Sequence, residues 1–267
     1  MIGNTKQYFI LPDIHDKHPA NGRLDRKTYH PALKAVWKIA EKYKPYGLVF
    51  LGDTSDMESL SYFDKDKRKK MEGQRYYKDI RSMNHLLDIT DKIFKDAKEK
   101  IYFVGNHEYR VELYAQYNAE MAHDSEDENS EGGIDYIRDT KLKERGYEVI
   151  PFNQTKMIGK ACFLHGIYTD TNHAAKMSRI YPKTIFYGHV HDIQTHSFVS
   201  PIDHKETRIA ESLGCLCSLN PEWLKNKPNK WINAFGILSV KDNGNFQMSR
   251  YIIINGEAIV DGIVYKG

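Results

Sequence analysis

Five short hydrophobic runs, each followed closely by Asp, Asn or His, set the pattern of this chain. Apolar runs of about four residues between turn residues are typical of buried strands. The runs span 8–11, 47–50, 101–104, 161–164 and 184–187, and the polar residues that follow them are Asp13, His15, Asp53, Asp56, Asn106, His107, His165, His189 and His191. The pattern therefore places a set of polar side chains at five strand ends.

Helical periodicity fills most of the first half, with helices predicted over 29–42, 75–99, 108–121, 134–145 and 173–180. The second half is mostly strands: a hairpin over 155–158 and 161–164, then runs near 194–199, 207–212, 234–240, 246–254 and 258–264. Asn243-Gly244 and Asn255-Gly256 predict tight turns. These elements predict an α/β fold with two sheets face to face and helices outside, in a single domain over 1–267. The acidic, glycine-ended stretch 123–133 is predicted to be a mobile surface insertion.

Strand ends of one sheet lie side by side, so the five polar stretches should meet at one place. Aspartate, asparagine and histidine together make a mixed nitrogen and oxygen ligand set, which suits manganese, iron or zinc better than calcium. In Gly188-His189-Val190-His191, an extended backbone would point both imidazoles the same way.

Composition adds only weak constraints on binding partners, cysteine chemistry and cellular location. The net charge of +3 is too small to predict nucleic-acid binding by itself. An odd count of 3 cysteines gives no disulfide framework, and a zinc role for Cys215 and Cys217 lacks a second cysteine pair. With no secretory signal and no apolar stretch near the roughly 20 residues that span a bilayer, the chain is expected to be a cytoplasmic protein with no membrane partner.

The ordered blocks Asp-x-His, Gly-Asp-x-x-Asp, Gly-Asn-His-Glu, His and Gly-His-x-His resemble those of the calcineurin-like metallophosphoesterases. The resemblance implies a four-layer α-β-β-α sandwich and a hydrolase with two divalent metals, manganese first, with iron, zinc, nickel or magnesium as alternatives. It implies attack on a phosphoester by a metal-bound hydroxide.

Residue by residue, the resemblance assigns the first metal to Asp13, His15 and His191, and the second to Asn106, His165 and His189. It gives Asp53 the bridge between them. His107 resembles the residue that protonates the leaving oxygen, and Asp56 the carboxylate that orients it. The other histidines are expected to be ordinary surface or hydrogen-bonded residues: His18, His30, His85, His123, His173, His196 and His204.

Departures from the family pattern bear on the substrate. Phosphoprotein phosphatases carry Arg-Gly after the second Asp, where this chain has Met57-Glu58, so a phosphodiester is favoured over a phosphomonoester. Arg110 is either a phosphate contact or a helix surface charge. The run 65–70 is expected to be a solvated face or else a phosphate-contacting arm.

The aromatics of 220–231 are expected to cover the core edge; the alternative is base stacking. The protein is therefore expected to hydrolyse phosphodiesters of nucleotides or nucleic acid. The alternative functions are a phosphomonoesterase or protein phosphatase and a metal-binding scaffold of the same fold. The sequence does not predict the oligomeric state.

Overall fold

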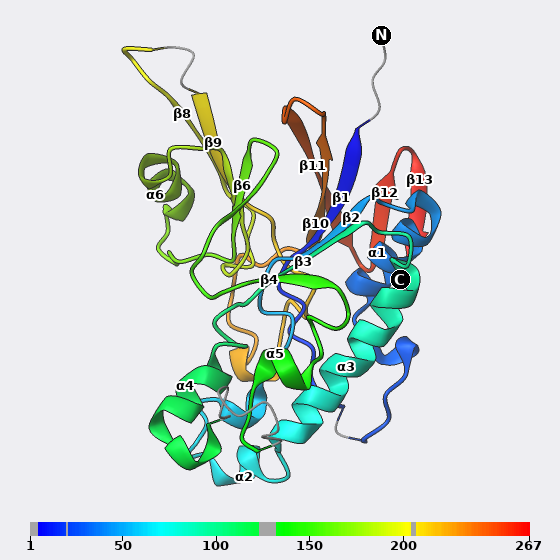
Figure 1. The fold of residues 1–267 in the computed structure, drawn as a ribbon, viewed down its shortest axis with the longest axis vertical. Helices are drawn as coiled ribbons and strands as arrows, with labels where there is room; N and C mark the ends of the chain where they lie inside the picture. The colour runs from blue at the N-terminus through cyan, green and yellow to red at the C-terminus, as the bar shows by residue number, and fades with distance from the viewer. Residues whose placement is uncertain (1–4, 20, 123–131, 204–206) are drawn as a thin grey trace.

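Two mixed β-sheets carry the fold of the computed structural model, which describes residues 5–19, 21–122, 132–203 and 207–267 (Figure 1). The larger sheet has the strand order β13-β12-β11-β10-β1-β2-β3-β4, and the smaller has the order β5-β6-β7-β9-β8. Strands β1 to β4 run parallel, as do β6, β7 and β9. The remaining pairs are antiparallel: β1 with β10, β10 with β11, β11 with β12, β12 with β13, β5 with β6, and β8 with β9. The strands are β1 (Lys6–Leu11), β2 (Gly47–Phe50), β3 (Glu99–Phe103), β4 (Tyr147–Ile150), β5 (Lys156–Ile158), β6 (Ala161–Leu164), β7 (Ile185–Tyr187), β8 (Thr195–Val199), β9 (Thr207–Ser212), β10 (Ala234–Val240), β11 (Phe246–Ile254), β12 (Glu257–Val260) and β13 (Ile263–Lys266).

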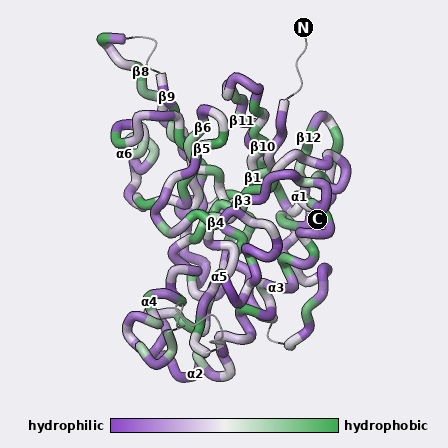
Figure 2. The backbone as a smooth tube through the Cα atoms, viewed as in Figure 1, coloured by the Kyte–Doolittle hydropathy of each residue, from purple (hydrophilic) through white to green (hydrophobic). Residues whose placement is uncertain are grey.

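Three apolar layers hold the elements together. Phe163 and Phe186 of the smaller sheet pack against Ile10 and Val49 of the larger one, so the two sheets lie face to face. Helices α1 (Pro31–Tyr43) and α3 (Tyr76–Ile93) bury their apolar sides on the outer face of the larger sheet. Helix α6 (His173–Ile180) covers the smaller sheet. This is the predicted α-β-β-α order. Figure 2 shows hydrophobic segments recurring along the central strands and hydrophilic ones over much of α2 (Arg68–Met71).

Three sequence-predicted elements end differently. Helix α3 stops at Ile93 rather than near residue 99, because the chain turns so that Lys98 N–H reaches Tyr46 O at 2.7 Å and begins β3. The helix predicted over 134–145 is only α5 (Tyr136–Asp139), since Lys141 takes a left-handed φ of 56°. The single strand expected over 258–264 is wrong: Asp261 and Gly262 form a tight turn at φ 49° and 76° between β12 and β13.

The helix expected over 108–121 is α4 (Arg110–Tyr117) followed by a 3-10 turn. Most of the proposed insertion, residues 123–131, lies outside the described residues. No helix within the described ranges is long and apolar enough to cross a membrane.

Candidate metal centre

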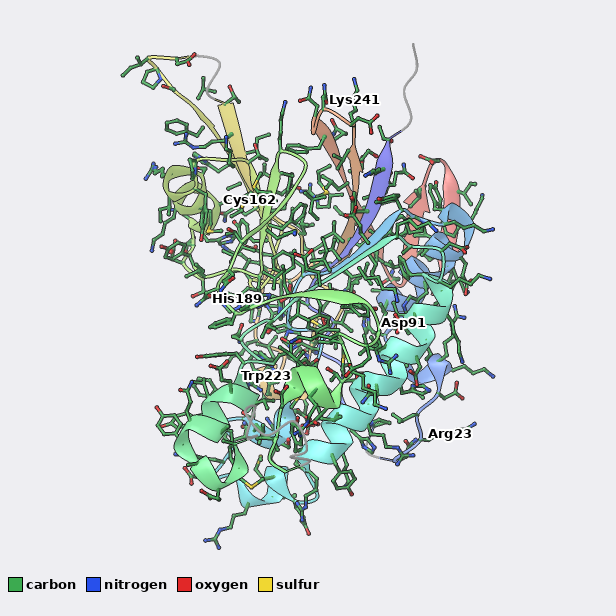
Figure 3. The ribbon with its side chains drawn as sticks, in the orientation of Figure 1. Arg23, Asp91, Cys162, His189, Trp223 and Lys241 are labelled. Carbon is green, nitrogen blue, oxygen red and sulfur yellow. The ribbon has the colours of Figure 1, made fainter. Side chains whose placement is uncertain are left out.

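The predicted ligands converge where strands of the two sheets end. Loops after β1, β2 and β3 bring in Asp13, Asp53 and Asn106, while His165 and His189 follow β6 and β7 of the smaller sheet. Figure 3 places His189 between the upper strands and the lower helices, at this junction.

One group of ligands lies around His15. Its Nε2 is 3.0 Å from Nε2 of His191, which is 3.3 Å from an Asp13 carboxylate oxygen. Two ring nitrogens and a carboxylate oxygen this close together are a donor set that fits a divalent cation.

A second group lies around His165. Its Nε2 is 3.1 Å from Oδ1 of Asn106 and 3.3 Å from Oδ2 of Asp53. The His189 ring lies 5.2 Å from the His165 ring, centre to centre, and its Nδ1 is buried with no hydrogen-bond partner among the described residues. A buried, unpartnered ring nitrogen in such a cluster fits a metal ligand.

Asp53 lies between the two groups. Its Oδ2 is 3.3 Å from His165 Nε2 and 3.8 Å from His15 Nε2, and the residue is almost fully buried. Burial alone would raise the pKa of this carboxyl, but the facing histidines, His165 first, hold the pKa well below its ordinary value. An ionised carboxylate between two nitrogen-rich groups is suited to bridge two cations.

Hydrogen bonds outside the ligand groups fix two of the imidazoles. The Nδ1–H of His165 donates to Leu51 O at 2.8 Å, and Nδ1 of His15 lies 3.1 Å from the Asp56 carboxylate. In each ring, Nε2 therefore keeps its lone pair free to bind a cation, and it lies toward the other ligands.

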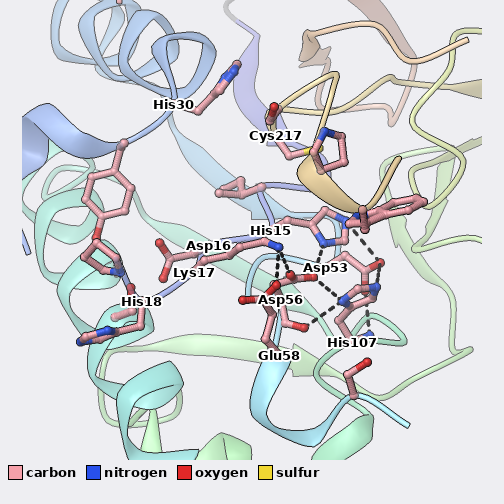
Figure 4. Close-up of a pocket in the computed structure, with 18 of the residues that line it drawn as sticks. His15, Asp16, Lys17, His18, His30, Asp53, Asp56, Glu58, His107 and Cys217 are labelled. Carbon is pink, nitrogen blue, oxygen red and sulfur yellow. Dashed lines mark hydrogen bonds and ion pairs between the residues drawn. The ribbon is translucent and has the colours of Figure 1, made fainter. Parts of the chain in front are cut away.

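Asp56 also contacts His107, the residue that it is predicted to orient. Its Oδ1 lies 2.8 Å from His107 Nδ1, and its Oδ2 accepts from Lys17 Nζ at 2.6 Å (Figure 4). Burial alone would raise the pKa of Asp56, but hydrogen bonds from His107 and His15 keep it well below its ordinary value. Burial would lower the pKa of His107, yet Asp53 and Asp56 raise it on balance.

Arg110 lies in the site rather than on the open surface. Its Nη2 is 3.1 Å from His107 Nε2, and its Nη1 donates to Asp56 O at 2.8 Å. The guanidinium is therefore next to the atom expected to exchange a proton with substrate.

The ligand loops have an unusual backbone. Asp13, His15, Asp53, His189 and His191 all have positive φ, between 40° and 71°. The expectation that His189 and His191 project from an extended strand is wrong, because β7 ends at Tyr187 and the chain turns. The turn sends His189 toward His165 and His191 toward His15.

Two motif glycines make room for ligand carboxylates. A Cβ on Gly105 would stand 2.2 Å from Asp53 Oδ1, and one on Gly188 would stand 2.3 Å from Asp13 Oδ2. Neither space admits a methyl group.

Glu108 is the structural residue that the sequence reasoning missed. Its buried carboxylate accepts the backbone N–H groups of Asp53 (3.1 Å), Thr54 (2.6 Å), Ser55 (3.0 Å) and Gly105 (2.9 Å). It also accepts the Tyr102 hydroxyl at 3.0 Å. It thereby ties the loop after β2 to the loop after β3. The only sequence signal is its place directly after Asn106-His107.

A pocket of about 880 Å³ opens over His15, Asp53 and His107. Trp223 and Trp231 line it, and Trp231 stands edge-on to His191, with ring centres 4.3 Å apart. In the run 65–70, Lys67 and Lys70 line the pocket wall and donate to Asp64.

Most of the described histidines that were expected to lie outside the site do lie outside it. His85, His173 and His196 are hydrogen-bonded elsewhere, to Tyr29, Tyr187 and Ser178. His18 and His30 do line the pocket, with His30 also capping α1. His123 and His204 are outside the described residues.

No family model and no curated relative matches the chain. Among solved structures, the chain is similar to Vps29 of Chaetomium thermophilum, at 11% identity over 98% of this chain and 96% of that chain, with a TM-score of 0.41. It is also similar to a dimetal phosphatase of Danio rerio, at 13% identity over 93% of this chain and 96% of that chain, with a TM-score of 0.43. Likenesses this slight carry no functional argument.

Proposed function

We propose that this protein is a dinuclear-metal phosphoesterase of the calcineurin-like type that hydrolyses phosphodiesters of nucleotides or nucleic acid. The observation that carries the proposal is the position of Asp53 between two separate ligand groups, with His107 near it and Arg110 next to His107. A mononuclear or purely structural site has no use for a bridging carboxylate next to a proton donor.

The residues divide the work as follows. Asp13, His15 and His191 would hold one cation, Asn106, His165 and His189 the other, and Asp53 both. Two cations held this way supply charge neutralisation of the phosphoryl oxygens and an activated water.

His107 then moves the proton. Its Nδ1 is held by Asp56 at 2.8 Å, so Nε2 is the atom left to protonate the leaving oxygen. Arg110, now 3.1 Å from that nitrogen, is placed to contact the phosphate of a substrate bound there.

The charges around the pocket favour a diester. Met57 stands where protein phosphatases carry an arginine, and it is fully buried. Lys17, Lys67 and Lys70 line the pocket but already pair with carboxylates. A phosphodiester carries one negative charge fewer than a monoester dianion and needs less of this positive charge.

The size and aromatic lining of the pocket favour a nucleotide unit. About 880 Å³ exceeds what a phosphate group needs, and the exposed rings of Phe63 and Trp223 face this space along with Trp231. Such rings stack on bases of any sequence.

The test offers manganese-loaded protein bis-p-nitrophenyl phosphate and p-nitrophenyl phosphate side by side. Faster turnover of the diester supports the proposal and leads to single-stranded DNA, RNA and cyclic nucleotides. Faster turnover of the monoester would make the protein a phosphomonoesterase, with Arg110 sufficient for the extra charge. Bound metal with turnover of neither ester, nor of the nucleotide substrates, would point to the metal-binding scaffold instead.

A further inference from the structure

The segment around Cys217 is built against the first ligand loop. The N–H of Leu216 donates to the carbonyls of Pro12 (3.1 Å) and Asp13 (3.0 Å). On the other side, Asn233 Nδ2 donates to Cys217 O at 2.8 Å. The backbone that carries Cys217 is thus fixed directly to the backbone of a predicted ligand.

The thiol of Cys217 lies with two of the imidazoles. One ligand atom each from His15, His191 and Cys217 falls within 4.8 Å of the others. Cys217 is buried, 7% exposed, and borders the same pocket as these histidines (Figure 4). Ligand atoms around one cation have separations of this order, since metal–nitrogen and metal–sulfur bonds are about 2.0–2.3 Å long.

The Cys215 thiol, two residues away, hydrogen-bonds the thiol of Cys217 but has other partners as well. Its Sγ lies 3.7 Å from Ile232 O and 3.7 Å from Asn233 Nδ2, within the backbone bridge that joins 215 to 233. Cys217, rather than Cys215, shares a candidate ligand group with His15 and His191 among the described residues. Replacing each cysteine in turn distinguishes the two thiols.

We propose that Cys217 is a further metal ligand, its thiolate completing the site of Asp13, His15 and His191. The inference rests on the proposed function in requiring a cation at that site. On binding, the S–H bond breaks, the proton passes to solvent and the sulfur bonds the metal.

A thiolate makes the two metal positions unequal. Soft sulfur donors select zinc, cobalt and iron over manganese, whereas the position of Asp53, Asn106, His165 and His189 offers only nitrogen and oxygen. We expect zinc to bind the sulfur-containing position on the order of tenfold or more tightly than in Cys217→Ser, with manganese affinity much less changed.

The test is the absorption spectrum of the full chain loaded with cobalt(II). Wild type should show a thiolate-to-cobalt charge-transfer band in the near ultraviolet. Cys217→Ser and Cys217→Ala should lose this band while keeping the visible cobalt bands and two bound ions. The matched controls are Cys215→Ser and Cys162→Ser, which should keep it. Cys162 is a buried thiol of the smaller sheet, distant from His189 in Figure 3.

The outcomes separate this inference from the proposed function. Absence of the near-ultraviolet band in fully cobalt-loaded wild type, or its persistence in both Cys217 variants, would overturn the ligand. Failure of the wild-type protein to bind cobalt would overturn both proposals. A Cys217-dependent band in a protein that hydrolyses no phosphoester would uphold the ligand and overturn the function.

Discussion

Replacing Glu108 by glutamine should damage both stability and metal binding, because this carboxylate faces only donors. One oxygen accepts from Thr54, Ser55 and Tyr102, and the other from Asp53 and Gly105. Glutamine has nearly the same shape but turns one oxygen into an NH₂ group. Even in its better orientation, that group would oppose two buried backbone N–H donors.

The cost follows from those two donors. A buried polar group left unsatisfied costs about 1–3 kcal/mol, so Glu108→Gln should lower the free energy of unfolding by about 2–6 kcal/mol. The displaced loops carry Asp53 and Asn106, so metal affinity should fall by on the order of 10–100-fold, as for other groups that position ligands.

Urea unfolding of metal-free protein measures the first effect, and calorimetric titration with Mn²⁺ the second. Glu112→Gln is the control: Glu112 lies on α4, which begins two residues after Glu108, is exposed, and accepts from Gln116 Nε2 only weakly at 3.3 Å. A free energy of unfolding for Glu108→Gln within about 0.5 kcal/mol of the wild-type value, the range of ordinary surface substitutions, would refute this supporting role.

Three further predictions concern other parts of the site. His107→Ala should lower turnover by about 10²–10⁴-fold with metal content near normal by elemental analysis; lost metal would make it a ligand instead. Gly188→Ala puts a Cβ 2.3 Å from Asp13 Oδ2, so metal content should fall toward one ion per chain, and two retained ions would contradict the contact. Burial would raise the pKa of Asp64, but hydrogen bonds from two lysines and Ser61 lower it below its ordinary value. Its folded pKa lies under its unfolded pKa, so its ionised form stabilises the fold above about pH 4 and loses that effect as pH falls. Asp64→Asn should therefore destabilise the fold at pH 7 and destabilise it less near pH 2, and an equal effect at both pH values would count against this pairing.

Much of the fold could be predicted because apolar runs of strand length are bounded by turn residues. The runs at 47–50 and 161–164 match β2 and β6 residue for residue, and the periodicity over 173–180 matches α6. The Asp261-Gly262 turn was missed although Asp-Gly is as strong a turn signal as Asn-Gly. Consecutive apolar residues stand on both sides of it, at 258–260 and 263–265, and together they imitate one continuous strand.

The support of the site is harder to predict than its ligands. Side-chain type and strand-end position predict which residues gather, but Glu108 and Cys217 act through partners more than 40 residues away in the chain or in a separate loop. Nothing next to Glu108 in sequence shows that its carboxylate accepts amides from the loop after β2. That contact depends on the parallel pairing of β2 with β3, which sets the two loops side by side.

The backbone of the ligand loops also explains why a strand-based prediction of side-chain direction fails here. A non-glycine residue at positive φ costs roughly 1–2 kcal/mol, and five predicted ligands adopt it. The cost is offset where one loop bonds the next, as in His15 N–H to Asp53 O at 2.9 Å and Asp56 N–H to Asp16 O at 2.9 Å. Such turns let residues two apart, like His189 and His191, face the two different ligand groups. An extended strand would have sent both imidazoles to one point, which would build one metal site rather than two.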